Sequence, residues 1–407
     1  MAREFLTSVT IREAFGLIGK NQYSVGTELI ALDHVFGRIA AEDIFSSEAI
    51  PAFPRSLVDG YGVISKDTQG ARETSPAFLK LSGEVRVGEV AQSTVKNGNC
   101  TRLSTGSMVP IGADSVVMQE YVRVMDGEVE ITRPVHKGEN VVYTGEDISA
   151  GQIILNRGTR IGPFHSGTLA AIGAARVRVF ARPKIALLSS GDEIIPVDEI
   201  PPIGKIRDIN RYTLGALIRL SGAELDFVGI ARDTIEDITE KMRAANGYDM
   251  ILVSGGSSKG ERDHIVDAIE SLGGEIFFHG VNIKPGKPTI FGDISGKPVF
   301  GLPGHPVSCA MAAVRFVLPL VKLMTHDASV APMPVTGHLS TNVPSSYGIE
   351  EYVRIKLSEE GGRYLVTPIF AKSSVISSLS QADGYIIIPE GIEGLEKDED
   401  VEVHRFV

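Results

Sequence analysis

Strand-like and helix-like patterns alternate along the centre of the chain, and this alternation predicts a parallel sheet. Apolar runs short enough for buried strands occur at Lys184–Leu188, Leu225–Ile230 and Met250–Val253. Helical periodicity separates them, for example at Arg211–Leu220. Strand–helix alternation with short connections favours a three-layer α/β domain, whose ligands bind beyond the carboxyl ends of the strands.

Polar residues mark where the helices of this domain should begin. Asn210 is expected to cap the first helix, and Asp233 opens the second. Asp263 stands at the N-cap position of a third helix. A long apolar helix over Val307–Met324 closes the domain, and Pro319 should kink it because proline removes a backbone hydrogen bond.

Short alternating runs separated by turn residues predict two further units that are rich in strands. One covers residues 46–145, and the other covers residues 332–407 as a small β-barrel or sandwich. Helices are expected outside these units as well, and one helix-like segment covers Leu32–Ile44. Two others have start signals. Thr10 and Glu13 form a capping box for the first, and Pro163 begins the second.

Composition limits the classes of function. The chain has 407 residues and a formal net charge of −11, which argues against a general nucleic-acid-binding protein. An anionic ligand would therefore need a local cluster of cations. Two cysteines are too few for a disulfide framework or a zinc site. The N-terminus has no apolar signal core and no run of 18 apolar residues occurs, so we expect a cytoplasmic protein that does not span a membrane.

Two loops rich in glycine and proline follow apolar strands and suggest an anion site. Ser254–Gly256 offers backbone that can approach a ligand closely, and Lys284–Pro288 holds two lysines on a turn stiffened by prolines. Neither a phosphate-loop lysine motif nor a G-x-G-x-x-G fingerprint is present. The alternatives are an ordinary glycine turn for the first loop and a solvated surface turn for the second.

Several carboxylates stand in glycine-rich or loop contexts, where convergence would suit a hard cation or acid–base chemistry. Each of them alone could equally be a cap or turn residue. They are Asp59, Asp147, Asp192, Glu193, Asp233 and Asp263. The nine histidines show no metal-ligand spacing, and no arrangement typical of a covalent nucleophile is present.

A set of short strings occurs in a fixed order along nearly the whole chain. They are Val58–Tyr61, Ser104–Gly106, Gly145–Gly151, Ser190–Glu193, Asp208–Arg211, Ser254–Gly256, Lys284–Pro288 and Gly301–Ser308. The ordered set resembles the molybdopterin molybdenumtransferase family, which includes the bacterial and archaeal MoeA proteins and the gephyrin E-domain.

The resemblance implies a multidomain α/β plus β protein that forms an elongated homodimer. The implied domains are domain I (1–45 with 146–180, discontinuous, helical and extended), domain II (46–145, β-rich), domain III (181–326, the three-layer molybdopterin-binding domain) and domain IV (332–407, a C-terminal β-barrel). The active site would lie between domain III of one subunit and domain II of the other. The family relationship also implies transient contact with a molybdopterin adenylyltransferase.

The family's reaction inserts molybdate into adenylyl-molybdopterin and releases AMP, with Mg²⁺ as the divalent cation. The resemblance implies catalytic roles for Asp59, Asp147, Glu193, Asp233 and Asp263, of which Asp263 and Glu193 would bind the metal. It implies substrate binding by Thr105, Ser254, Gly255, Gly256, Lys284, Lys287, Pro288, Ser308, Arg354 and Ser373. Tungstate is a tetrahedral dianion of nearly the same size, so the sequence does not distinguish it from molybdate.

One departure from the family pattern concerns the anion site, and two other functions stay open. His305 replaces the usual asparagine of the Gly-Asn-Pro-Val-Ser string, which would alter hydrogen bonding near the oxyanion. A stand-alone adenylyltransferase resembles only residues 184–325, so the flanking segments favour the molybdenum-inserting enzyme. The full set of acids and lysines argues against a non-catalytic scaffold, the third hypothesis.

Overall fold

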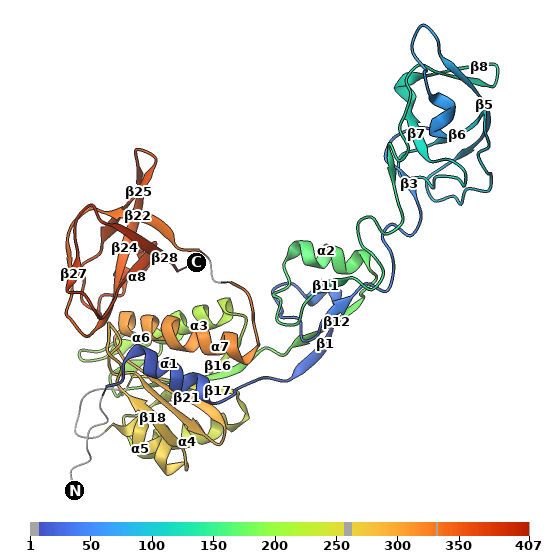
Figure 1. The fold of residues 1–407 in the computed structure, drawn as a ribbon. Helices are drawn as coiled ribbons and strands as arrows, with labels where there is room; N and C mark the ends of the chain where they lie inside the picture. Colours follow the sequence, from blue (N-terminus) through green and yellow to red (C-terminus); the bar gives the residue numbers. More distant parts are fainter. Residues whose placement is uncertain (1–7, 256–262, 331–332, 407) are drawn as a thin grey trace.

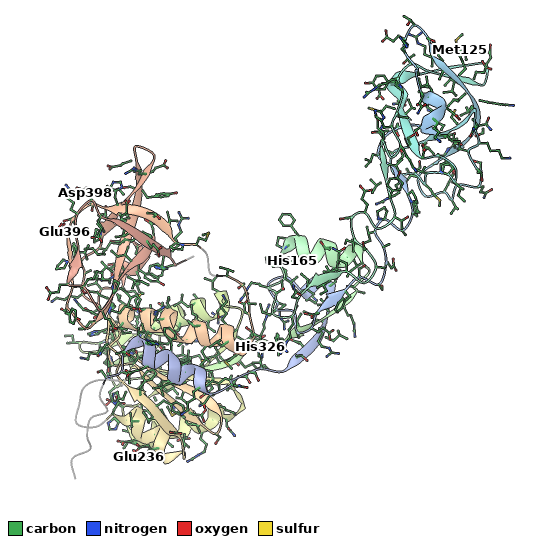
Figure 2. All side chains as sticks on the ribbon, viewed as in Figure 1. Met125, His165, Glu236, His326, Glu396 and Asp398 are labelled. Atoms are coloured by element: carbon green, nitrogen blue, oxygen red, sulfur yellow. The ribbon has the colours of Figure 1, made fainter. Side chains whose placement is uncertain are left out.

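The structure is a computed structural model that describes residues 8–255, 263–330 and 333–406. The chain forms several bodies arranged along an elongated molecule (Figure 1). The α/β domain and the C-terminal barrel lie at one end, and the β-rich unit lies at the other. Met125 in the β-rich unit and Glu236 in the α/β domain lie toward these opposite ends (Figure 2). The expected multidomain α/β plus β architecture is confirmed.

The α/β domain is built on a six-stranded sheet. In spatial order its strands are β16 (Glu224–Ala231), β13 (Lys184–Ser190), β17 (Met250–Ser254), β21 (Lys297–Leu302), β20 (Ile290–Ile294) and β18 (Glu275–His279). The first four strands are parallel, as the strand–helix alternation predicts. β20 and β18 extend the sheet in antiparallel fashion, because hairpin-like connections rather than helices precede and follow β20.

Helices cover both faces of this sheet, and alternate residues of each strand point to opposite layers. On β13, Ile185 and Leu187 enter one core, and Ala186 and Leu188 enter the other. The first core lies under the helices α1 (Ile11–Lys20), α3 (Asn210–Leu220), α6 (Pro306–Ala312) and α7 (Leu318–Met324). The second lies under α4 (Ile235–Ala244) and α5 (His264–Ser271). Because β13 and β17 are parallel neighbours, the loops that follow them lie at the same edge of the sheet.

Two of the three expected helix caps are corrected by the structure. Asn210 is the first residue of α3 rather than its cap, and its side chain points elsewhere. Thr234, not Asp233, caps α4 by accepting a hydrogen bond from the backbone N–H of Asp237. The third expectation is confirmed, because Asp263 Oδ1 accepts a 3.1 Å hydrogen bond from the backbone of Ile265 at the start of α5.

The long apolar helix runs from Pro306 to Met324 and contains a π-helical segment, Ala313–Val317, between α6 and α7. This irregularity lies just before Pro319, where proline's missing N–H was expected to disturb the helix. By length and composition alone the helix could cross a membrane. However, 67% of its most apolar window is buried inside the protein. The core of the α/β domain therefore accounts for its apolar character.

Helix α1 belongs by its packing to the α/β domain. The predicted capping box is present, since Thr10 Oγ1 accepts from the backbone of Glu13 and the Glu13 carboxylate accepts from the backbone of Thr10. Ala14 and Ile18 are buried in the same core as Phe316. This helix therefore packs on the α/β domain, and the domain bounds implied by the resemblance stay a prediction. Within residues 32–44, where a helical segment was expected, the structure forms a short 3-10 helix at Leu32–His34 instead.

The middle of the molecule is a small extended unit. Strand β1 (Thr27–Ala31) pairs with β12 (Arg176–Phe180), and helix α2 (Pro163–Ala171) packs beside them. Beyond it lies the β-rich unit, a six-stranded sheet. Its strands in order are β7 (Ser115–Met118), β4 (Gly60–Val63), β6 (Asn99–Leu103), β5 (Ala77–Val85), β9 (Glu128–Ile131) and β8 (Val122–Met125).

The C-terminal unit is a closed barrel, which decides between the barrel and the sandwich. Its strands in order are β24 (Glu350–Glu360), β25 (Arg363–Pro368), β22 (Val335–Leu339), β28 (Asp400–Arg405) and β26 (Gly384–Ile388), and β26 pairs back to β24. The short strand β19 (Ile283–Lys284), from the α/β domain, adds to β24 in parallel. This pairing holds the barrel beside the α/β domain and brings the segment Lys284–Pro288, with its two lysines, against the barrel.

Candidate active site

A cavity of about 660 Å³ lies between the α/β domain and the barrel. Six residues that the sequence marked as substrate-binding line it, namely Lys284, Lys287, Pro288, Ser308, Arg354 and Ser373. They come from the end of β19 and the loop that follows it, from the start of α6, and from the barrel. The fold thus brings together side chains that lie up to about ninety residues apart in the chain, and neither domain alone forms the cavity.

Arg354 is the buried cation of this cavity, with 7% of its surface exposed. Its Nη1 donates to Ser378 Oγ and its Nη2 donates to the carbonyl of Ala371, each at 2.6 Å. Its Nε has no hydrogen-bond partner. Burial lowers the pKa of Arg354 from its ordinary value. A buried guanidinium without a carboxylate among its hydrogen-bond partners is poorly compensated, so this position favours an incoming anion.

The two lysines of the predicted anion turn differ in their partners. Lys284 Nζ lies 2.9 Å from Glu351 Oε1, and the other oxygen of Glu351 accepts a 2.8 Å hydrogen bond from Ser345. Lys287 is exposed and has no ion-pair partner among the described residues. Lys287 is therefore the freer of the two to bind a ligand.

Sequence reasoning missed two charged residues that line the cavity, Lys372 and Glu351. Glu351 could have been found only from the register of β19 on β24, which sets it opposite Lys284. Lys372 stands directly before Ser373 in a segment without secondary structure. With these two, four cationic side chains and one carboxylate face the cavity, which is the local cationic cluster that an acidic protein needs for an anionic ligand.

The start of α6 forms the third side of the cavity. Ser308 lies in the first turn and is buried. The backbone N–H of Val307 donates to the carbonyl of Ser373, and His305 Nδ1 shares a 3.0 Å hydrogen bond with Ser373 Oγ. The positive end of the helix dipole points toward this side, which adds to the attraction for an anion.

A second group of predicted residues gathers at the carboxyl edge of the sheet. Ser254 ends β17 and is buried, and Gly255 follows with φ +100°. A Cβ at Gly255 would collide with the carbonyl oxygen of Ser190, so only glycine fits there. Gly256, the third residue of this predicted loop, lies outside the described residues.

Asn210 is a functional candidate that the sequence misplaced as a helix cap. Its Nδ2 donates to Ser254 Oγ at 2.8 Å and to the carbonyl of Gly304 at 2.9 Å. One amide therefore joins the loop after β17 to the loop before α6. Asn210 Oδ1 and Ser190 Oγ are buried without hydrogen-bond partners, and such atoms at a strand-end loop favour a polar ligand.

Asp263 and Glu193 are the two residues expected to hold a divalent cation. Asp263 is 9% exposed, and its Oδ2 lies 3.3 Å from His279 Nε2 without forming a hydrogen bond. Glu193 is exposed, and its carboxylate lies against Gly191. Within the described ranges, no three His, Cys, Asp or Glu residues converge on a metal position. Asp263 Oδ2, which accepts no hydrogen bond, fits a cation whose other ligands are phosphate oxygens and water, as is usual for Mg²⁺.

Two other predicted acids lie apart from the cavity. Asp233 follows β16, and its backbone N–H lies 3.3 Å from Asp192 Oδ1, so it stands at the same sheet edge as Glu193. Asp147 is exposed in the connection between the extended unit and the β-rich unit, where its backbone N–H donates to Ile50. The structure therefore groups Asp233 with the strand-end loops and leaves Asp147 outside them.

Asp59 and Thr105 form a small preorganised pair in the β-rich unit. Asp59 Oδ1 accepts hydrogen bonds from Thr105 N at 2.7 Å and from Thr105 Oγ1 at 3.1 Å. Both residues are exposed. A Cβ at the neighbouring Gly60 would collide with the carbonyl of Val117. Within one chain this unit lies at the end of the molecule opposite the α/β domain and the barrel, between which the cavity lies (Figure 1).

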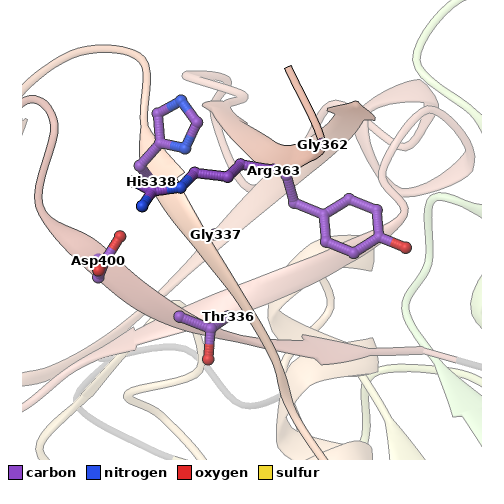
Figure 3. Close-up of a pocket in the computed structure, with 7 residues that line it drawn as sticks. Thr336, Gly337, His338, Gly362, Arg363 and Asp400 are labelled. Atoms are coloured by element: carbon purple, nitrogen blue, oxygen red, sulfur yellow. The ribbon is translucent and has the colours of Figure 1, made fainter. Parts of the chain in front are cut away.

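A further depression on the barrel holds none of the predicted site residues. It has a volume of about 290 Å³ and is lined in part by His338, Arg363 and Asp400 (Figure 3). These side chains come from β22, β25 and β28. The lysine- and arginine-lined cavity between the two domains is therefore the stronger candidate for an anion.

Comparisons with known proteins match the domain order. Family models match residues 9–173 as the MoeA N-terminal region (domain I and II), 186–323 as a probable molybdopterin-binding domain, and 336–406 as the MoeA C-terminal region (domain IV). A protein of Methanocaldococcus jannaschii assigned to molybdopterin biosynthesis is 37% identical over 377 residues, which is 90% of this chain and 89% of that relative. The chain belongs to the MoeA family.

Other MoeA relatives agree with this assignment. The molybdopterin molybdenumtransferase of Staphylococcus epidermidis is 30% identical over 406 residues, which covers 99% of this chain and 97% of that protein. The crystal structure of a molybdopterin biosynthesis MoeA protein from Pyrococcus horikoshii matches with a TM-score of 0.87 and 37% identity, over 98% of this chain and 100% of that chain. The resemblance seen in the sequence strings is confirmed.

MoeA membership places the protein in molybdenum cofactor biosynthesis. It also bears on the alternative of a stand-alone adenylyltransferase, which would resemble the sheet domain only. The matches at residues 9–173 and 336–406 lie outside that domain. The family match therefore includes the β-rich unit and the barrel as well as the sheet domain.

Proposed function

We propose that the protein is a molybdopterin molybdenumtransferase, which inserts molybdate or tungstate into adenylyl-molybdopterin and releases AMP. The observation that carries the proposal is the cavity between the α/β domain and the barrel. There Arg354 is buried with an unpartnered Nε, and Lys287 faces the same space without an ion-pair partner among the described residues. A compact tetrahedral dianion is a ligand that such a set of donors can satisfy.

The neighbouring strand-end loops suit the second substrate. Ser190, Asn210 and Gly255 offer buried polar atoms and close backbone approach at the carboxyl edge of the sheet, where nucleotide-like ligands bind in parallel α/β folds. Asn210 links these loops to Gly304, four residues before Ser308 in the anion cavity. The segment Gly301–Ser308 thus connects the two sites, as a transfer between two bound substrates requires.

Mg²⁺ would be held by Asp263 and Glu193 together with substrate phosphate oxygens. The buried Oδ2 of Asp263, which accepts no hydrogen bond, supports this assignment. The ion would neutralise phosphate charge when bound. Asp233, at the same sheet edge, would orient the adenylyl part of the substrate.

We further propose a homodimer in which the active site is shared. Asp59 and Thr105 are exposed and joined by hydrogen bonds, yet their β-rich unit lies at the end of the molecule opposite the α/β domain and the barrel (Figure 1). A second copy in antiparallel orientation would bring its Asp59 to the cavity, with Asp147 on the connecting segment nearby. The closed symmetry of such a dimer would give two equivalent sites.

The proposed setting is the cytoplasm, where the protein would receive adenylyl-molybdopterin by transient contact with a molybdopterin adenylyltransferase. A complex that forms only while substrate is transferred would be weak and small in area. Cross-linking of the two purified proteins, with and without adenylyl-molybdopterin, measures this contact. An absence of cross-linked product in both conditions would contradict it.

The decisive experiment supplies the purified protein with adenylyl-molybdopterin, Mg²⁺ and molybdate. The expected result is release of AMP together with formation of a cofactor that activates a molybdenum-free apoenzyme. Release of AMP should require both oxyanion and Mg²⁺. A protein that leaves adenylyl-molybdopterin intact under these conditions would not be a molybdenumtransferase.

A further inference from the structure

His305 stands at the junction of the α/β domain and the barrel. It is the residue directly before α6, but its side chain makes no capping hydrogen bond to the helix. Instead its Nδ1 shares a 3.0 Å hydrogen bond with Ser373 Oγ on the barrel. The capping role passes to Ser373, whose carbonyl accepts from the N–H of Val307. The helix is therefore capped from the neighbouring domain.

The barrel segment that receives these bonds also positions Arg354. The backbone N–H of Ile369 donates to the Arg354 carbonyl, and Arg354 Nη2 donates to the carbonyl of Ala371. The same segment contributes Lys372 and Ser373 to the cavity. Whatever holds Ser373 against α6 therefore also sets where the buried guanidinium and one of the lysines stand.

We propose that His305 is a positioning residue for the oxyanion, which acts through Ser373 to hold the segment 369–373 against the start of α6. The inference rests on the function proposed above, since it concerns the same cavity. His305 itself is exposed and is not among the residues that line the cavity, so its effect on the ligand is indirect. The two bonds to Ser373 differ in kind, because the backbone bond survives any side-chain change whereas the imidazole bond does not.

Removal of the imidazole should weaken oxyanion binding without unfolding the protein. The loss of one hydrogen bond predicts an affinity about two- to tenfold lower for His305→Ala. His305→Asn, which keeps a short polar side chain, should recover part of that loss. Isothermal titration of the full-length protein with tungstate, a stable oxyanion, measures both values, and thermal unfolding shows whether the variants remain folded.

A double-mutant cycle with Ser373→Ala distinguishes an indirect from a direct role. If His305 acts through Ser373, then His305→Ala should have no further effect on tungstate affinity in the Ser373→Ala background. Equal effects of His305→Ala in both backgrounds would overturn the inference, because they would mean that the imidazole acts on the ligand by another route. An unchanged affinity in the single variant would also overturn it.

His338→Ala is the matched control, since it removes a part-exposed imidazole from another face of the barrel. It should bind tungstate as the unaltered protein does. If the unaltered protein itself binds no tungstate, the proposed function fails first, so that failure is separate from the failure of the His305 inference. A weakening by His338→Ala equal to that by His305→Ala would point to general loosening of the barrel and would contradict a specific role.

Discussion

The interdomain cavity and the Asp59–Thr105 pair are two kinds of functional region. The cavity is assembled from five separate stretches of one chain, and the buried cation Arg354 has a guanidinium Nε without a hydrogen-bond partner. Asp59 is exposed, and its carboxylate is already oriented by two hydrogen bonds from one neighbour. The first region thus has unmet bonding capacity but a fixed enclosure. The second has fixed geometry but no enclosure within its own chain.

The proposed homodimer would divide the site between two copies along this difference. A buried charge must be supported by the domain that buries it, so Arg354 cannot be delivered from outside. An exposed carboxylate carries little desolvation cost, and local hydrogen bonds suffice to fix its direction. The β-rich unit can therefore hold Asp59 ready for a cavity on another chain.

Loss of the buried cation Arg354 should have the largest effect, and this effect should be on tungstate affinity. Arg354→Ala should lower tungstate affinity about 100- to 1,000-fold, because it removes a desolvated charge from the binding site. Isothermal titration measures the change. Lys356→Ala, which removes an exposed cation from the same strand, is the control and should bind normally. Similar losses in both variants would mean that net charge, rather than the buried guanidinium, governs binding.

A mixture of two inactive variants should test whether the site is shared. Asp59→Asn and Lys287→Ala should each slow AMP release about 100-fold, since each removes one preorganised group. When the two chains are unfolded and refolded together in equal amounts, half of the dimers should be mixed and carry one intact site. The activity should then recover to about a quarter of that of the unaltered protein. Activity that stays at the level of the single variants would show that Asp59 and Lys287 serve sites within one chain.

A backbone change in the β-rich unit should separate the two regions further. In Gly60→Ala the new Cβ would press on the carbonyl of Val117 and shift the adjoining Asp59. AMP release should fall about tenfold, because small misplacements of a reacting group are costly, while tungstate affinity stays unchanged. Gly83→Ala in the same unit has room for its Cβ and should be neutral in both assays. A parallel loss of tungstate binding in Gly60→Ala would contradict the separation.

The smallest effect concerns the connection between the two regions. Arg160, in the extended unit, lies 2.7 Å from Asp327, which follows α7. Burial acts to raise the pKa of Asp327, but hydrogen bonds from Ser329 and Arg160 outweigh it and hold that pKa below its usual range. The contribution to stability is therefore complete above about pH 4 and is lost as the pH falls through the lowered pKa.

Urea unfolding checks this acid sensitivity. Between pH 6 and pH 3, the unaltered protein should lose about 1 kcal/mol more of its unfolding free energy than Asp327→Asn does, because the variant has no carboxylate to protonate. Asp327→Asn should be the less stable protein at pH 6. Equal pH dependence in the two proteins would show that the contact of Arg160 with Asp327 does not stabilise the connection between the extended unit and the α/β domain.

Much of the α/β domain could be predicted from the sequence because its signals are local. Apolar runs and helical periodicity marked the parallel strands, and the cap at Asp263 followed from its place before α5. Asn210 could not be assigned correctly in this way. Its position at a helix start suits a cap, but its amide instead bridges two loops that follow different strands. Such a role depends on tertiary contacts that no local pattern records.

The candidate site shows the same limit. The family resemblance marked six residues that do line the cavity, four of them within the ordered strings. Glu351 and Lys372 required knowledge of how the barrel lies on the α/β domain. The strings also grouped Asp59 with these residues, although the β-rich unit that carries Asp59 lies at the other end of the molecule from the α/β domain and the barrel. The order of motifs in the sequence can identify the residues of a site, but only the fold shows which of these residues lie together within one chain.

The pairing of β19 with β24 joins the α/β domain to the barrel, so an oxyanion bound beside it would also stabilise the contact between these two domains. Lys287 belongs to the α/β side of the cavity and Arg354 to the barrel side, so like charges face each other across the seam between two bodies. The bound dianion would cancel that repulsion and bind the two bodies together. The substrate would then stabilise the contact between the domains, and saturation with tungstate should raise the unfolding temperature of the barrel.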